Sequence, residues 1–134
     1  MKLTEDNYVE IAEHAIQNLC MQKDKRGKIV NLVTTSKIRN LLAMTAGIYN
    51  EVVNMQNDKL PADIIGRINY LKIRFVYEAG REPLVGKLVE EADILKCLDE
   101  IKGSRSRYIL FSRYMEALVA YRKYYGKLNG MKDE

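Results

Sequence analysis

Residues 67–81 read RINYLKIRFVYEAGR, and the spacing of their side chains is that of an amphipathic α-helix. One face of this helix, extended one turn upstream, is apolar and carries Ile64, Ile68, Leu71 and Phe75. A second stripe alternates arginine and tyrosine at intervals of three and four residues, namely Arg67, Tyr70, Arg74, Tyr77 and Arg81. The segment therefore predicts a helix with a core face and an adjacent basic, aromatic stripe.

The same helical period extends over most of the chain. We expect helices over about 6–21, from a cap at Thr35 or Ser36 to about 56, over 61–80, from 83 to about 98, and over 105–126. Ser104 is a suitable cap for the last helix, which we expect to stop at Gly126. No strand alternation is apparent. The sequence therefore predicts an all-α fold: one domain over 1–134, built as a compact bundle of five helices, or six if the fourth is broken near 90–93.

The composition is that of a globular protein, with 47% hydrophobic and 30% charged residues among 134. No apolar run approaches the ~20 residues that span a bilayer. The acidic N-terminus lacks the apolar core of a signal peptide. We therefore expect a cytoplasmic protein that does not associate with membranes. Cys20 and Cys97 have no closely spaced cysteine or histidine partner, so we interpret them as reduced, partly buried thiols.

Charge is distributed unevenly along the chain, whose net charge is +4. Residues 23–39 and 103–127 each carry a net +5, whereas the segment that precedes each of them is acidic. Basic segments that converge in space would form a patch suited to a polyanion. Lys37 and Arg39 lie in the expected first turn of the second helix, where the helix dipole favours an anion. The charge pattern therefore favours a polyanion-binding surface.

The sequence gives little support to catalysis. His14 is the only histidine, and no cysteine or serine partner for it can be identified by spacing. The acidic run EEAD at 90–93 lacks the histidine of a di-metal helical site. GREPLVGKL at 80–88 has five residues between its glycines where a phosphate loop has four. We therefore expect no enzymatic activity, no metal site and no cofactor.

Three segments, taken in order, resemble one known family. They are TTSKIRNLLAM (34–44), LKIRFVYEAGRE (71–82) and YMEALVAYRKYYG (114–126), and together they are similar to the small subunit of type III-A CRISPR–Cas effector complexes, the Csm small subunit. The resemblance implies a non-catalytic helical bundle, several copies of which stack head to tail beside the other Csm subunits. It also implies contact with the backbone of CRISPR RNA and target RNA without sequence specificity, since phosphate contacts position a nucleic acid without reading it.

The resemblance also implies which basic residues contact RNA, by their place in or beside the matching segments: Lys37, Arg39, Lys72, Arg74, Arg81, Arg113, Arg122 and Lys123. Four more candidates rest on charge alone: Arg67 and the loop residues Lys25, Arg26 and Lys28. We expect Tyr70 and Tyr77 to be mainly structural, at the rim of the core. Two alternatives stay open. One is a helical protein-interaction module that pairs its arginines with acidic helices and does not touch nucleic acid. The other, with less support, is a small enzyme.

Overall fold

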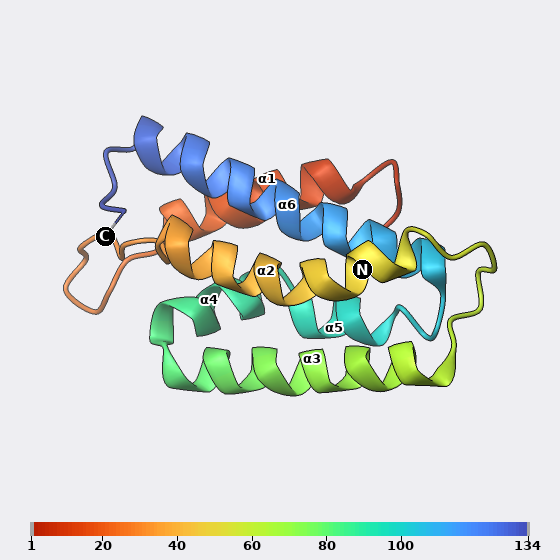
Figure 1. Cartoon of the computed structure of the whole chain (residues 1–134). Coiled ribbons are helices and arrows are strands. Elements are labelled where there is room, and N and C mark those ends of the chain that lie inside the picture. Colours follow the sequence, from red (N-terminus) through yellow and green to blue (C-terminus); the bar gives the residue numbers. More distant parts are fainter. Residues whose placement is uncertain (1, 134) are drawn as a thin grey trace.

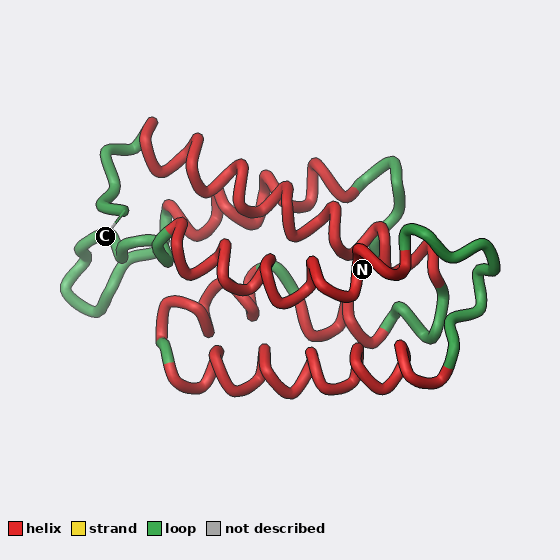
Figure 2. The backbone as a smooth tube through the Cα atoms, in the orientation of Figure 1, coloured by secondary structure: helices red, strands yellow, loops and turns green. Residues whose placement is uncertain are grey.

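The computed structural model describes residues 2–133, and within them it contains six α-helices and no strand (Figure 1). The helices are α1 (Tyr8–Cys20), α2 (Thr35–Val52), α3 (Ala62–Arg81), α4 (Pro83–Glu91), α5 (Ile94–Asp99) and α6 (Arg105–Leu128). Figure 2 shows that the loop before α2 and the loop after it lie at opposite ends of the bundle. This architecture confirms the all-α fold expected from the helical period.

The ends of the helices follow local sequence signals. The Thr34 side chain accepts a hydrogen bond from the Lys37 amide, and Ser104 accepts one from the Arg107 amide. Each cap satisfies a first-turn donor that has no partner within its helix. The cap of α2 therefore lies one residue earlier than expected. Between α4 and α5, Asp93 has a φ of 55°, a left-handed conformation that interrupts an α-helix and produces the expected break.

α6 is the longest of the six helices and packs along both α1 and α2, whereas α3 forms an outer layer on α2, α4 and α5 (Figure 1). The buried apolar side chains form one cluster, in which Phe75 of α3 meets Phe111 of α6 with ring centroids 6.2 Å apart. An aromatic pair of this kind adds about 0.5–1.5 kcal/mol to the effect of area burial. Because only one stripe of α3 enters this core, the rest of the helix surface is left to solvent.

Two buried tyrosines of α6 tie the helices together through polar bonds. Tyr108 donates its hydroxyl to the Thr45 carbonyl oxygen at 2.8 Å, and Tyr114 donates to the Ala92 carbonyl oxygen at 2.7 Å. Burial raises the pKa of both phenols, so they stay protonated and can donate. These bonds fix α6 against α2 and against the end of α4.

The 21–34 loop is docked onto the bundle. Leu32 and Val33 are buried, and the loop contains one isolated antiparallel bridge, between Lys23 and Ile29. The apolar end of the loop therefore anchors its basic part close to the start of α2. Both loop and helix start lie at the end of the bundle where α3 and α6 finish (Figure 1).

Both cysteines, Cys20 and Cys97, are buried free thiols, which agrees with the interpretation of the sequence. Burial, together with the nearby acids Glu100 and Asp93, raises the pKa of Cys97 to about 12. Across residues 2–133, no helix has the length and hydropathy to cross a membrane, and no group of three or more His, Cys, Asp or Glu residues could hold a metal ion.

Candidate nucleic-acid interface

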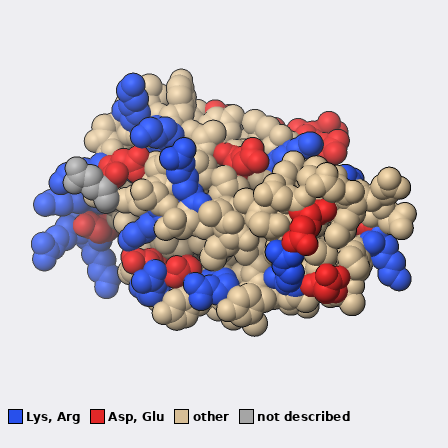
Figure 3. Space-filling view, viewed as in Figure 1, with Lys and Arg blue, Asp and Glu red and all other residues tan. Residues whose placement is uncertain are grey.

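One end of the bundle collects basic side chains from segments that are far apart in the sequence. The 21–34 loop, the first turn of α2 and the last turns of α3 and α6 all lie there (Figure 1). Figure 3 shows lysine and arginine side chains gathered at this end of the visible face. We call this surface the basic end and define it by Lys25, Arg26, Lys28, Lys37, Arg39, Arg81 and Lys123, all exposed or half-exposed. The fold thus brings the basic segments of the sequence together.

Three cations of the basic end form ion pairs with carboxylates of the chain. The pairs are Lys37 with Glu82 at 2.8 Å, Arg81 with Glu78 at 3.0 Å and Lys123 with Asp133 at 3.4 Å. The hydrogen bond from Lys37 lowers the pKa of Glu82. Ion pairs with solvent access contribute only about 0–1 kcal/mol. A phosphate group can therefore replace such a carboxylate at small cost, and the pairing leaves these cations available to a ligand.

Arg39, Arg74 and Arg113 are exposed and form no ion pair with any carboxylate of residues 2–133. Arg39 belongs to the basic end, and Arg74 lies farther along α3. Arg113 lies on α6 and is separated from Lys123 by about 15 Å along the helix axis, at a rise of about 1.5 Å per residue. Like the exposed loop residues Lys25, Arg26 and Lys28, which form no ion pair within residues 2–133, these three guanidinium groups are available to an external anion.

A groove between α2 and α3 continues from the basic end along the bundle. Lys37 and Arg81 line its first part, and Met44 lines both parts. The second part has a volume of about 580 Å³ and is lined by Met44, Ile48, Asp63, Gly66, Arg67, Tyr70, Leu71 and Arg74. Arg67 also pairs with Glu51 of α2, so its side chain connects the two walls. The groove therefore carries arginines of the α3 stripe away from the basic end.

The tyrosines of the α3 stripe are exposed, and this corrects the expectation that they lie at the rim of the core. Tyr70 exposes 61% and Tyr77 exposes 57% of its surface. The guanidinium carbons of Arg74 and Arg81 lie 5.7 and 5.9 Å from the centroid of the Tyr77 ring, within cation–π range. Tyr77 therefore helps to position two arginines of the interface, whereas Tyr70 forms part of the groove wall.

Lys72 lies on the flank of α3 that faces α5. Its Nζ is 2.6 Å from Asp99 Oδ1, beside a separate groove between α3 and α5. The buried face of α3, which includes Leu71 and Phe75, separates Lys72 from the arginine stripe. A ligand in the α2–α3 groove therefore does not contact Lys72.

Arg122 lies inside the protein, with 1% of its surface exposed. Its Nε donates to the Val33 carbonyl oxygen, and its Nη2 donates to the Lys132 carbonyl oxygen at 2.8 Å. The guanidinium packs against Gly126, where any Cβ atom would overlap Arg122 Nη1. Gly126 is thus a packing position within α6, which continues to Leu128, and it is not the helix stop expected from the sequence. Because the guanidinium does not reach solvent, we do not retain Arg122 in the candidate interface.

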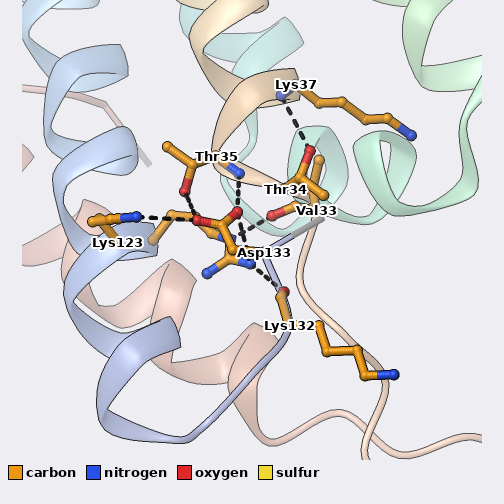
Figure 4. Close-up of polar contacts among 8 residues, drawn as sticks. Val33, Thr34, Thr35, Lys37, Lys123, Lys132 and Asp133 are labelled. Carbon is orange, nitrogen blue, oxygen red and sulfur yellow. Dashed lines mark hydrogen bonds and ion pairs between the residues drawn. The ribbon is translucent and has the colours of Figure 1, made fainter.

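The C-terminal tail packs against the start of α2 (Figure 4), and its residues Lys132 and Asp133 contact Arg122. The Asp133 carboxylate accepts hydrogen bonds from the Thr35 hydroxyl and from the Thr35 amide, both at 2.6 Å. These bonds, with Arg122 at 3.4 Å, lower the pKa of Asp133 to about 2. The positive end of α2 therefore receives an anion, as expected of a helix N-terminus, and here the anion belongs to the chain itself.

Comparison with known proteins shows the family to which the chain belongs. Residues 13–128 match the family model of Csm2, type III-A. The chain belongs to the Csm2 family. A protein of Streptococcus thermophilus, described as CRISPR system Cms protein Csm2, is 47% identical over 92% of this chain and 95% of its own length. A protein of Mycobacterium tuberculosis with the same description is 40% identical over 92% of this chain and 95% of its own length. One of Enterococcus italicus, also with this description, is 38% identical over 77% of this chain and 78% of its own length.

Membership of the Csm2 family confirms the resemblance to the small subunit of type III-A effector complexes. Sequence reasoning did not anticipate two features of this family member, the docking of Asp133 and the exposure of Tyr70. No local spacing predicts the docking of Asp133, because Asp133 and Thr35 are 98 positions apart. The exposure of Tyr70 could have been predicted. Tyr70 follows the buried Ile68 by two residues, which is about 200° around a helix of 3.6 residues per turn and places it on the side away from the core.

Proposed function

We propose that this protein is a non-catalytic small subunit of a type III-A CRISPR RNA-guided effector complex in the cytoplasm. It forms one domain, stacks head to tail in several copies beside the other Csm subunits, and binds the backbone of guide and target RNA. The observation that carries the RNA-binding part is the convergence of cations from distant segments at the basic end (Figure 3).

The contacts are to phosphate, which suits a subunit that serves many different guides. Arginine and lysine hold phosphate oxygens through charge and hydrogen bonds, and such contacts position RNA without reading its sequence. A few contacts per copy give weak binding in isolation. Stacked copies bind more strongly, because the assembly raises the effective concentration of each further contact.

The geometry divides the candidate residues into two groups. The basic end and the α2–α3 groove form one continuous surface, to which we assign the RNA backbone; its predicted members are Lys37, Arg39, Arg67, Arg74, Arg81 and Lys123. Lys72 lies beside the separate groove between α3 and α5, and Arg113 lies about 15 Å along α6 from Lys123; we assign both to contacts with neighbouring subunits.

A second candidate function is an assembly module without direct contact to RNA. The observation that favours it is the outer face of α3, where Ile73 and Val76 expose 61% and 50% of their surfaces. Exposed apolar side chains that lie together indicate contact with another protein. Both functions use α3, so an experiment on the cations is needed to separate them.

An electrophoretic mobility shift with single-stranded RNA at two salt concentrations tests the proposal. Wild-type protein should bind weakly, and its affinity should fall as salt increases. Changing Lys37, Arg39, Arg74 and Arg81 together to glutamine should weaken binding and reduce the salt slope by roughly 0.7 for each phosphate group that is no longer neutralised. The matched control removes four exposed lysines outside the interface, by the same change at Lys2, Lys59, Lys96 and Lys102.

An RNA affinity that does not change with salt concentration, or that falls equally in the interface variant and in the control, would overturn the RNA-binding proposal and favour the assembly module. Co-expression with a CRISPR RNA and the other effector subunits tests the rest. The protein should co-purify with both, and an RNA-free monomer recovered under those conditions would contradict its role as a subunit.

A further inference from the structure

The second part of the α2–α3 groove combines an apolar floor with a basic and aromatic wall. Ile48 and Leu71 are 5% and 4% exposed and belong to the core, and the half-buried Met44 lines the groove with them. Tyr70 and Arg74 of α3 rise beside this floor. A planar apolar group bound in this groove would be shielded from water and would lie next to the positive charge of Arg74.

Tyr70 presents a free aromatic surface to this groove. It is 61% exposed, and within residues 2–133 no aromatic ring and no cation stacks on it. Tyr77, one helical repeat later, differs because Arg74 and Arg81 already lie against its ring. An uncovered tyrosine ring is a platform on which another π system can stack.

Arg67 and Arg74 stand on either side of Tyr70 along α3. Their Cα atoms are seven residues apart, which is about 10.5 Å at a rise of about 1.5 Å per residue. Asp63 also lines the groove, and Glu51 pairs with Arg67, so Arg74 is the lining cation without a carboxylate partner in residues 2–133. A ligand that fits this arrangement has a planar apolar centre and negative charge on both sides, which is the chemistry of a nucleotide within an RNA strand.

We propose that the groove binds one unpaired base of single-stranded RNA, stacked on Tyr70, with the flanking phosphates on Arg67 and Arg74. The inference rests on the proposed RNA-binding function and adds a contact to a base. Stacking tolerates any sequence, because every base has a π face. A base inside a duplex is covered on both faces by its neighbours, so the site distinguishes unpaired from paired RNA.

A fluorescent base analogue reports this contact directly. The probe is an oligouridine with one central 2-aminopurine, titrated with the full-length protein. Wild-type protein should quench the fluorescence, because the analogue stacks on Tyr70. Tyr70→Ala should abolish the quenching and weaken binding of this strand about 5- to 150-fold, the range expected for one stacked base. Tyr70→Phe should behave as wild type, since the ring is kept.

Ile73→Ala is the matched control, because Ile73 is as exposed as Tyr70 on the same helix and does not line the groove. It should leave quenching and affinity unchanged, and duplex RNA should bind wild type and Tyr70→Ala equally well. Quenching that survives in Tyr70→Ala, with salt-dependent binding intact, would overturn this inference and leave the proposed function standing. Absence of salt-dependent binding to any RNA would overturn both. An equal decrease in Ile73→Ala would assign the outer face of α3 to the contact in place of the groove.

Discussion

Replacing Gly126 with alanine should destabilise the protein, although alanine is the better helix former. In an unhindered helix interior this exchange stabilises by about 1 kcal/mol. At this position the new Cβ overlaps Arg122 Nη1 and comes within 3.1 Å of Arg122 Cζ. The guanidinium is enclosed, with 1% of the side chain exposed, so it can move only by leaving the carbonyl oxygens of Val33 and Lys132.

The size of the effect follows from those two hydrogen bonds. A bond from a charged donor contributes about 1.5–3 kcal/mol, so breaking both costs roughly 3–6 kcal/mol. The gain in helix propensity offsets about 1 kcal/mol of this. The free energy of unfolding of Gly126→Ala should therefore be lower than that of wild type by about 2–5 kcal/mol, a large part of the stability of a small domain.

Urea denaturation followed by far-ultraviolet circular dichroism measures the difference from the midpoint and slope of unfolding. Gly66→Ala is the control, because Gly66 also lies within a helix and an added Cβ would meet nothing within 4 Å. It should unfold at the same or a higher urea concentration than wild type. If Gly126→Ala is as stable as Gly66→Ala, the packing of the Arg122 guanidinium against Gly126 is refuted.

Three further predictions concern other contacts of the fold. Asp133→Asn should unfold at a lower temperature than wild type at neutral pH, and the difference should shrink as pH falls from 3.8 towards about 2. The reason is that a lowered pKa stabilises the fold only while the carboxylate is ionised; a constant difference by calorimetry over this range would contradict it. Tyr108→Phe and Tyr114→Phe should each lower the free energy of unfolding by about 0.5–1.5 kcal/mol, because each change removes one buried hydrogen bond between helices. Urea midpoints equal to wild type would show that these hydrogen bonds do not contribute to stability. Cys97, whose pKa burial raises to about 12, should react with a thiol-specific disulfide reagent only in denaturant, and rapid labelling of the native protein would show that the site opens.

The helices could be predicted from sequence because their causes are local. Ser104 caps α6 as expected, and the acidic segment is broken at Asp93, inside the expected range. A glycine misleads a prediction from sequence when it is required by a tertiary contact and not by the local backbone. Gly126 suggests a helix stop, yet it is required inside α6 because Arg122 occupies the space of a Cβ.

The candidate site could be predicted only in part. Charge and family resemblance select Arg122 and Lys123 together, since the two are adjacent and both basic. The fold separates them: Arg122 packs inward onto carbonyl groups of the docked loop and the tail, and Lys123 remains exposed. Which of two neighbours faces the core depends on contacts with segments about 90 positions away, such as Val33, and no local pattern contains that information.

The basic end also has a consequence for the energetics of folding. Cations that are far apart in the unfolded chain repel one another once folding gathers them, and the carboxylates of the chain neutralise them only in part. Dissolved salt screens this repulsion over a Debye length of about 10 Å at 0.1 M, and the same salt weakens attraction to phosphate. Ionic strength therefore acts in opposite directions on the two equilibria: it favours the compact state and opposes the bound one. An RNA backbone bound at the basic end, as we propose, would supply the missing counter-charge and so relieve this repulsion.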